Sequence, residues 1–218
     1  MRKHVITLLV SFVAMGGTAI ASDLFDKVHI MIKPAGILAI DGHFNDTTKL
    51  RETLNPGLGI GLGFRYKIGD NTYLDFSYSY NWLAVKEEFR PFDYQHQTPA
   101  FEMHNFCLNG NFYLASGYFI EPYLTLGAGI SSWKFSQKIL GADAWQAPGN
   151  SSESFSDISP LVNIGLGLEV YAFSKISIIG EVKYNYLFSR NVDKFGTDDF
   201  TQQDYLTVNL GFIFRFGK

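Results

Sequence analysis

Nine charged residues occupy positions where charge is unexpected, because each lies in a stretch of alternating polar and large apolar residues and takes the polar phase. The nine are Lys33, Arg65, Lys67, Asp75, Glu121, Glu169, Glu181, Lys183 and Arg215. Carboxylates and cations held close together can exchange protons as general acids and bases, or they can pair as a structural layer. The choice depends on the elements that position them and on the solvent that the apolar phase meets.

A nucleophilic site would need a serine, a base and an orienting acid near one rim of the fold. His104 with Glu102, and Ser131 with Ser132, are the residues that could form one. Their spacing matches no catalytic motif, and His104 shares the apolar phase of Phe106. We therefore predict that the protein is not an enzyme.

Metal and nucleotide binding are also disfavoured. His29, His43 and His96 lack metal-ligand spacing. The alternating glycines of residues 57–63 do not open a helix as a dinucleotide fingerprint must, because the alternation continues as a strand. Those glycines would leave room inside a narrow barrel or let a neighbouring side chain approach. No cofactor and no metal are predicted.

The first residues have the pattern of an export signal. Arg2 and Lys3 precede a short apolar run, and Ala19-Ile20-Ala21 provides a small-x-small cleavage site. We predict a signal peptide over residues 1–21, cleaved after Ala21, and a single domain over residues 22–218; an uncleaved anchor is the alternative. Cleavage removes two of the 18 basic residues and none of the 21 acidic ones, so 16 against 21 leave a charge of −5 and favour no nucleic-acid partner.

Composition narrows the fold class. Hydrophobic residues make up 46% of the chain and aromatic residues 16%, yet after the signal no apolar run approaches the length of a membrane-spanning helix. The one cysteine, Cys107, can form no disulfide within the chain, and we interpret it as a small residue inside a strand. An exported, aromatic, glycine-rich chain of this kind is either a secreted all-β domain or an outer-membrane barrel.

The clearest strand is the last. Over residues 205–216, large apolar residues alternate with smaller or polar ones for six successive pairs. The apolar phase consists of Leu206, Val208, Leu210, Phe212, Phe214 and Phe216. Similar alternation predicts seven further strands, at about residues 27–40, 57–68, 74–82, 105–114, 123–131, 162–171 and 176–188.

The connections between these strands alternate in length. Long polar connections at residues 41–56, 86–99, 135–159 and 190–203 take turns with short ones at 69–71, 115–118 and 172–175. Long and short connections must therefore lie at opposite ends, as in outer-membrane barrels, whereas a Greek-key sandwich has no such alternation. We predict an all-β fold, an eight-stranded antiparallel up-and-down transmembrane β-barrel.

One strand is irregular. Pro34 and Gly36 interrupt the first strand, and because proline removes a ladder hydrogen bond we expect a bulge there. The facing of residues 37–40 is left open.

The polar phase of the strands should line the barrel interior. Asn105, Asn109 and Asn111 suit a wet lumen better than a dry core, because a buried amide needs several partners. Strands tilted by about 45° in an eight-stranded barrel leave an interior just wide enough for side chains. We therefore expect the nine charges, most of them near the short connections, to form a paired layer that plugs the lumen.

Three segments carry a resemblance to a known family. Residues 121–130 contain a Pro-Tyr-x-x-x-Gly-x-Gly strand, residues 165–171 read Gly-Leu-Gly-Leu-Glu-Val-Tyr, and residues 211–216 read Gly-Phe-Ile-Phe-Arg-Phe. The mature chain resembles the small outer-membrane β-barrel family that includes OmpX, OmpW and the transmembrane domain of OmpA. The sequence contains no segment similar to the peptidoglycan-binding domain of OmpA-type proteins.

The resemblance implies a location in the bacterial outer membrane, with lipid and the barrel-assembly machinery as partners. That machinery reads a terminal aromatic residue in the family, whereas here Phe216 is followed by Gly217 and Lys218. Family members serve as structural barrels, adhesins or narrow channels. We predict an envelope structural or surface-contact protein with a plugged lumen and four extracellular loops, which could contact a surface or host ligand.

Two alternatives remain open. The first is an OmpW-like narrow channel for small hydrophobic solutes, with a vestibule of loop aromatics at Phe89, Phe92, Tyr94, Trp145 and Phe155. The second is a lipid-modifying barrel enzyme.

Overall fold

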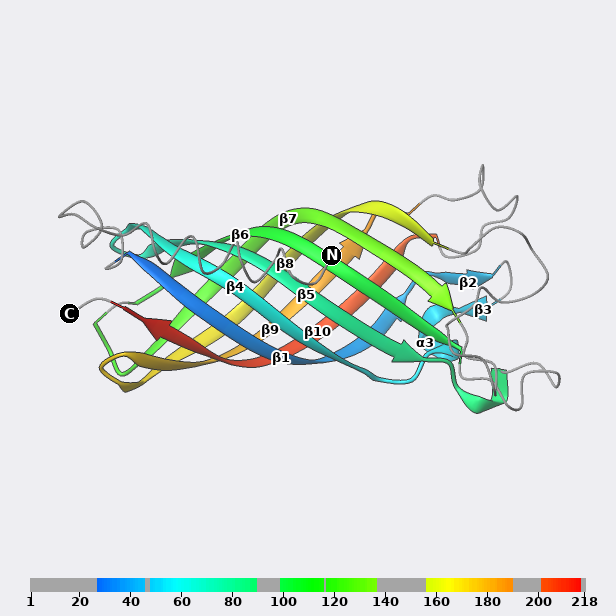
Figure 1. Cartoon of the computed structure of the whole chain (residues 1–218), viewed down its shortest axis with the longest axis horizontal. Coiled ribbons are helices and arrows are strands. Elements are labelled where there is room, and N and C mark those ends of the chain that lie inside the picture. The colour runs from blue at the N-terminus through cyan, green and yellow to red at the C-terminus, as the bar shows by residue number, and fades with distance from the viewer. Residues whose placement is uncertain are drawn as a thin grey trace, which may run out of the picture.

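The computed structural model describes residues 27–45, 48–89, 99–115, 117–136, 156–189 and 201–216. Within them eight long strands close into a barrel in the order β1-β10-β9-β8-β7-β6-β5-β4 (Figure 1). Neighbouring strands in this order pair antiparallel, and β10 closes the barrel by pairing with β1. The predicted signal peptide over residues 1–21 lies outside the described residues.

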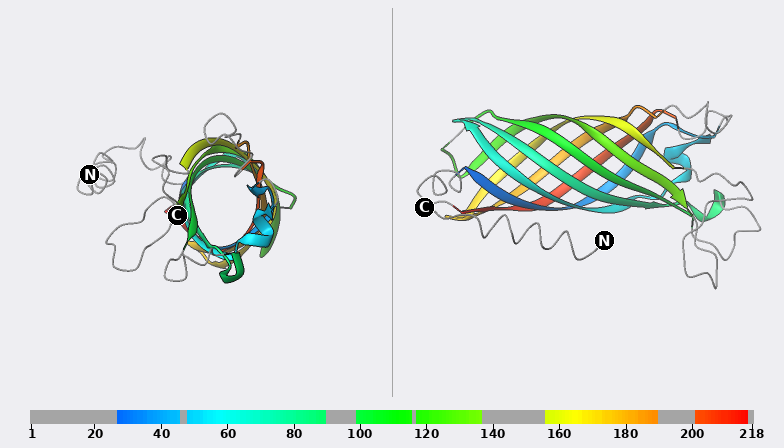
Figure 2. Two further views of the ribbon diagram at one scale, coloured as in Figure 1. Left: turned by 90° about the vertical axis from the view of Figure 1, so that its right-hand side faces the viewer. Right: turned by 45° about the horizontal axis from the view of Figure 1, so that its top comes forward.

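The barrel strands run obliquely to the long axis of the molecule (Figure 2). They are β1 (Val28–Asp41), β4 (Gly57–Gly69), β5 (Thr72–Ala84), β6 (Ala100–Tyr113), β7 (Ile120–Ser136), β8 (Ser156–Phe173), β9 (Ile176–Leu187) and β10 (Gln203–Arg215). The all-β up-and-down barrel predicted from the alternation is therefore confirmed. Strands β7 and β8 extend further than predicted, so Phe135 lies within β7 and not in a loop.

Burial follows the predicted phases. On β10 the apolar residues Val208, Leu210 and Phe212 are exposed on the outer wall, whereas Asn209 and Ile213 are buried inside. Large exposed apolar side chains recur on every barrel strand, with Leu58 at 73% exposure as an extreme. A continuous belt of this kind differs from the scattered exposed apolar residues of soluble proteins.

Pro34 does not produce the expected bulge. The register of β1 against β4 runs unbroken from Val28 to Ile37, with Pro34 opposite Ile60. On the β10 side the register is the same before and after Pro34, although the pairs at positions 33 and 34 are missing, and the register shifts only further along, between Ala39 and Asp41. The pyrrolidine ring of Pro34 therefore removes the ladder hydrogen bond on the β10 side without shifting the strand. Beyond it, Ile37 points inward and Leu38 points outward.

The connection over residues 41–56, which the sequence predicts as a long polar connection, includes regular secondary structure. It contains β2 (His43–Asn45), β3 (Thr48–Lys49) and the short helix α3 (Leu50–Thr53). The physical reason is burial, because Leu50 and Leu54 are almost fully buried at the barrel mouth. A further short helix, η1 (Glu87–Phe89), begins the next long connection. None of the helices in the described residues could cross a bilayer.

Inward-facing glycines make room for large neighbours. A Cβ atom at Gly167 would overlap the ring of Tyr123, and one at Gly127 would overlap the side chain of Asn109. Both partners lie on the neighbouring strand. In the narrow interior, a large side chain on one strand thus fills the space beside a glycine on the neighbouring strand.

Candidate functional site

The barrel interior is the candidate functional site, and its lining changes in character along the axis. One end, here the turn end, carries the connection at residues 70–71 and that at 174–175, while the other, the loop end, carries α3 (Figure 1). Ionic residues lie toward the turn end, a polar chamber follows, and an apolar cluster fills the loop end.

Arg65 is the centre of the ionic part. It lies directly opposite Asp75 in the β4–β5 ladder, so the two side chains meet inside the barrel. Arg65 Nε donates to Asp75 Oδ1 at 2.7 Å and Nη2 donates to Oδ2 at 2.8 Å. Both side chains are 1% exposed, which makes this a buried bidentate pair.

The same guanidinium spans the lumen to β6 and β8. Arg65 Nη1 donates to the hydroxyl of Tyr113 at 2.5 Å and to Glu169 Oε2 at 3.0 Å. The Tyr113 hydroxyl in turn donates to Glu169, and Arg215 of β10 pairs with the other oxygen of that carboxylate. Strands β4, β6, β8 and β10 are thereby tied across the interior.

A second group centres on Glu181. Lys183 Nζ lies 3.2 Å and Lys33 Nζ lies 3.6 Å from Glu181 Oε1. Tyr123 donates its hydroxyl to Glu181 Oε2 at 3.1 Å. Lys33 also lies 3.9 Å from Asp75 Oδ2, so the two groups share one layer.

Two of the nine predicted residues lie outside these ion pairs. Glu121 instead accepts hydrogen bonds from the Tyr171 hydroxyl at 2.5 Å and from the Gly117 backbone N–H at 2.6 Å. Arg215 lies over the Tyr171 ring at 4.3 Å, which links Glu121 indirectly to the layer. Lys67 makes no ion pair with any residue that the structure describes.

Sequence reasoning missed the tyrosines of this layer. Tyr113, Tyr123 and Tyr171 all bond to its carboxylates. Their inward phase was the available signal, since Tyr123 shares the face of Glu121, Tyr171 that of Glu169, and Tyr113 that of the inward asparagines of β6.

The polar chamber lies next to the ionic layer and has a cavity volume of about 40 Å³. Its polar lining comprises Lys33, Ser77, Ser79, Asn81, Asn105, Cys107, Lys183, Asn185, Thr207 and Asn209. The side-chain oxygen of Asn105 is buried and has no hydrogen-bond partner in the described protein. Buried amides in this position are normally satisfied by water, so the chamber suits a hydrated interior.

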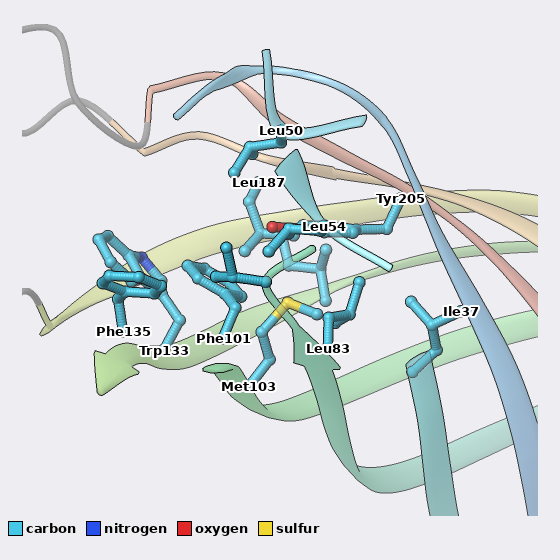
Figure 3. Close-up of a cluster of buried hydrophobic side chains, with 12 residues drawn as sticks. Ile37, Leu50, Leu54, Leu83, Phe101, Met103, Trp133, Phe135, Leu187 and Tyr205 are labelled. Carbon is cyan, nitrogen blue, oxygen red and sulfur yellow. The ribbon is translucent and has the colours of Figure 1, made fainter. Parts of the chain in front are cut away.

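An apolar cluster closes the loop end (Figure 3). It consists of Ile37, Leu50, Leu54, Leu83, Val85, Phe101, Met103, Trp133, Phe135, Leu161, Leu187 and Tyr205. Phe101 stacks on Trp133 with ring centroids 5.3 Å apart, and Leu50 reaches the cluster from α3. Sequence reasoning missed this cluster as well, although the inward phase turns apolar toward the ends of the strands, as from Asn81 to Leu83.

The residues considered for catalysis are divided between the two faces of the wall, and Ser132 lies directly opposite His104 in the β6–β7 ladder. Ser131 is buried inside the barrel while Ser132 is exposed. The His104 ring bonds through Nδ1 to the Tyr78 hydroxyl at 2.9 Å on the outer wall, and Glu102 pairs with Lys134 at 3.0 Å.

The histidines show no metal site in the part of the chain that the structure describes. No three histidine, cysteine, aspartate or glutamate side chains there gather as a metal ion would require. His29 lies inside the barrel near Tyr73, with ring centroids 6.2 Å apart, and His43 lies in β2. His96 lies outside the described residues.

No protein-family model and no curated protein matches the sequence. Solved structures do match, and Neisserial surface protein A aligns with a TM-score of 0.56 at 15% identity, over 87% of this chain and 97% of its own. The chain has the fold of the small outer-membrane β-barrels.

Two more structures share the small-barrel fold. Ail from Yersinia pestis, solved in complex with the heparin analogue sucrose octasulfate, aligns with a TM-score of 0.50 at 21% identity, over 87% of this chain and 98% of its own. A major outer-membrane protein from Thermus thermophilus aligns with a TM-score of 0.51 at 9% identity, over 87% of this chain and 99% of its own. At such identities the likeness establishes the small-barrel fold alone, and the function must come from the chain's own residues.

Proposed function

We propose that the protein is an integral outer-membrane β-barrel with a plugged lumen, which serves the bacterial envelope as a structural or surface-contact protein and not as an enzyme. The observation that carries the proposal is the continuous apolar outer wall of a closed barrel with a polar interior. A protein in water would have the opposite arrangement.

The outer wall fits a bilayer in both chemistry and hydrogen bonding. Every barrel strand presents large apolar side chains to the outside, and the aromatic residues Tyr80 and Trp82 lie on the outer face toward the loop end of β5. Rings of this type favour the headgroup level. Because β10 pairs with both β9 and β1, the barrel has no open sheet edge to expose to hydrocarbon.

The orientation follows from the connections. In outer-membrane barrels of this kind the short turns and both termini face the periplasm, whereas the long connections face the outside. The proposed signal peptide over residues 1–21 would export the chain, and the assembly machinery would insert it. The four long connections, α3 among them, would then form the surface that could meet a surface or host ligand.

The lumen contains two obstacles in series. The ionic layer fills the turn end with ion pairs that reach from β4 to β10, and the apolar cluster fills the loop end beneath α3. A solvated ion moving through the barrel would have to pass both. This arrangement favours a plug over an open pore.

Conductance tests the plug directly. The purified, folded barrel is inserted into planar bilayers, and heat-modifiable gel mobility verifies that it is folded. We expect no reproducible single-channel steps, whereas regular steps of constant size would rule out the plugged lumen.

A second function is favoured by one specific observation, the apolar cluster at the mouth. Such a lining could accept a small hydrophobic solute, as a narrow channel would require. Phe89 of η1 is 39% exposed, while the other four predicted vestibule aromatics lie outside the described residues. Quenching of tryptophan emission by an added apolar solute, lost in Trp133→Phe, would support this alternative over a purely structural role.

The enzyme alternative has its own test. Ser132 lies opposite His104 on the outer wall, but the His104 ring bonds to the Tyr78 hydroxyl and Glu102 pairs with Lys134, which supports a role without catalysis. Expression of a lipid-modifying barrel would change the lipid A or phospholipid pattern of the host membrane. We expect unchanged lipids.

A further inference from the structure

One buried cation in the lumen is poorly satisfied by the protein. The Lys33 side chain is 6% exposed, and its ion-pair contacts are long, at 3.6 Å to Glu181 and 3.9 Å to Asp75. Within the described residues the ammonium makes no hydrogen bond. An ammonium carries three N–H donors, and burying them without acceptors is costly.

The carboxylates that could serve Lys33 are already engaged. Glu181 Oε1 lies closer to Lys183 and accepts a hydrogen bond from Asn209 Nδ2 at 3.2 Å. Asp75 uses both of its oxygens for Arg65. The free side of Lys33 therefore faces the polar chamber, whose wall it forms together with Lys183.

The charge balance points the same way. The ion-paired layer contains the cations Lys33, Arg65, Lys183 and Arg215 and the carboxylates Asp75, Glu169 and Glu181. Four cations against three carboxylates leave one positive charge in this layer.

The chamber can supply what an anion needs. The amide of Asn105 lines it beside the two lysines, whereas the donors of Asn185 and Thr207 are engaged within the protein. Its cavity volume of about 40 Å³ has room for a small ion with little water. The Lys183 side chain keeps 13% exposure although it points into the lumen. We infer that the polar chamber binds one small monovalent anion of the chloride class at the wall formed by Lys33 and Lys183.

The charge and the surroundings select the class of anion. One monovalent ion cancels the excess positive charge, whereas a divalent anion would replace it by an excess negative charge of the same size. The ionic layer on one side and the apolar cluster on the other leave the chamber no room for a long molecule. The site is independent of whether the barrel conducts or contacts a surface.

Anomalous X-ray diffraction with bromide tests the site. Crystals of the detergent-solubilised barrel are grown in sodium bromide, because bromide substitutes for chloride and scatters anomalously. We expect a bromide peak in the chamber within contact distance of the Lys33 and Lys183 ammonium groups. Lys183→Met removes the excess charge, so it should lose the peak while its heat-modifiable mobility shows a folded barrel.

Lys67→Met is the matched control, since it removes a lysine that lies outside the chamber lining, and it should keep the peak. A wild-type crystal with bromide only at other places, or with none, would overturn the inference. So would a peak that persists unchanged in Lys183→Met. If that variant fails to fold, Lys33→Met takes its place, and the wild-type map still decides.

Discussion

At the scale of single residues, Arg65 shows why a charged interior can hold a small barrel together. Its guanidinium contacts Asp75, Tyr113 and Glu169 from three other strands, and its planar fork matches the carboxylate of Asp75 at both oxygens. A lysine could offer only a point charge at this position. The arrangement cross-links the wall through the lumen where no apolar core is available.

Arg65→Met should destabilise the barrel by about 3 to 5 kcal/mol, because it leaves the Asp75 carboxylate buried without its main partner. The double variant Arg65→Met with Asp75→Leu should recover part of that loss. The free energy of unfolding in bilayers or detergent, from a urea titration, measures both. Lys67→Met is the control and should stay within about 0.5 kcal/mol of wild type; equal stability of Arg65→Met and wild type would show that the ionic layer does not contribute.

At the scale of elements, the short helix α3 determines whether the loop end is closed. The Leu50 backbone N–H donates to the Gly42 carbonyl at 2.9 Å, and the Lys86 N–H donates to the Thr53 carbonyl at 2.7 Å, which fix the segment to β1 and to the end of β5. Gly42 has φ +107°, a left-handed conformation that suits glycine and lets the chain turn back over the mouth. Four helical residues could not persist alone, so their packing on the apolar cluster maintains them.

Leu50→Ala should loosen this closure. Losing a fully buried leucine side chain costs about 2 kcal/mol or more. If α3 opens locally, as mobile segments do, the open population should rise roughly 30-fold, since about 1.4 kcal/mol is a factor of ten. Cys107 packs against the apolar cluster and lines the chamber, so its accessibility reports the opening of α3. Alkylation of Cys107 by a thiol reagent should therefore be faster in Leu50→Ala than in wild type.

Arg51→Ala on the same helix provides the comparison, since Arg51 is exposed and should leave the alkylation rate unchanged. Alkylation of Cys107 at one common rate in wild type, Leu50→Ala and Arg51→Ala would mean that α3 does not control access to the chamber.

At the scale of the whole molecule, the barrel inverts the usual placement of polar and apolar residues. The outer wall takes the apolar phase of all eight strands, and the lumen takes the charges, amides and hydroxyls. Two inward clusters are exceptions, the apolar cluster at the loop end, which α3 covers, and the small group of Met31, Ile179 and Ile213 near the turn end. The molecule thus combines an apolar exterior with a largely polar interior.

Leu210→Arg tests that exterior. Leu210 is 62% exposed and lies midway along the outward face of β10, so in a bilayer an arginine there should cost about 2 to 4 kcal/mol. Leu206→Arg on the same face lies nearer the loop end and should cost about 1 kcal/mol or less, since the penalty falls toward the interface. Unfolding titrations in bilayers measure the difference; stability that does not depend on depth would show that this face does not meet lipid.

Asn209→Arg probes the neighbouring position on the inner face. It avoids lipid, but it brings a further cation beside Glu181 and crowds the chamber. Its effect should therefore respond to lumen substitutions such as Lys183→Met, whereas that of Leu210→Arg should not.

The sequence by itself determined the wall. Alternation of period two assigns each strand residue to one of two faces, so the strand count, the facing and the up-and-down order could be read from segments such as residues 205–216. The bulge predicted at Pro34 was wrong, because the effect of a proline on a strand depends on which neighbouring strand its missing N–H would have faced. That neighbour is known only once the barrel closes and β1 pairs with β10.

Only the tertiary structure decided what meets inside the lumen. Arg65 and Glu169 are 104 residues apart in the chain, and their contact depends on the tilt and register of strands that are not neighbours. The same applies to Leu50 and Trp133 in the apolar cluster, which come from a connection and a strand. The periodicity of the sequence determines which side of the sheet each residue faces, whereas its partner across the lumen is determined by closure of the whole barrel.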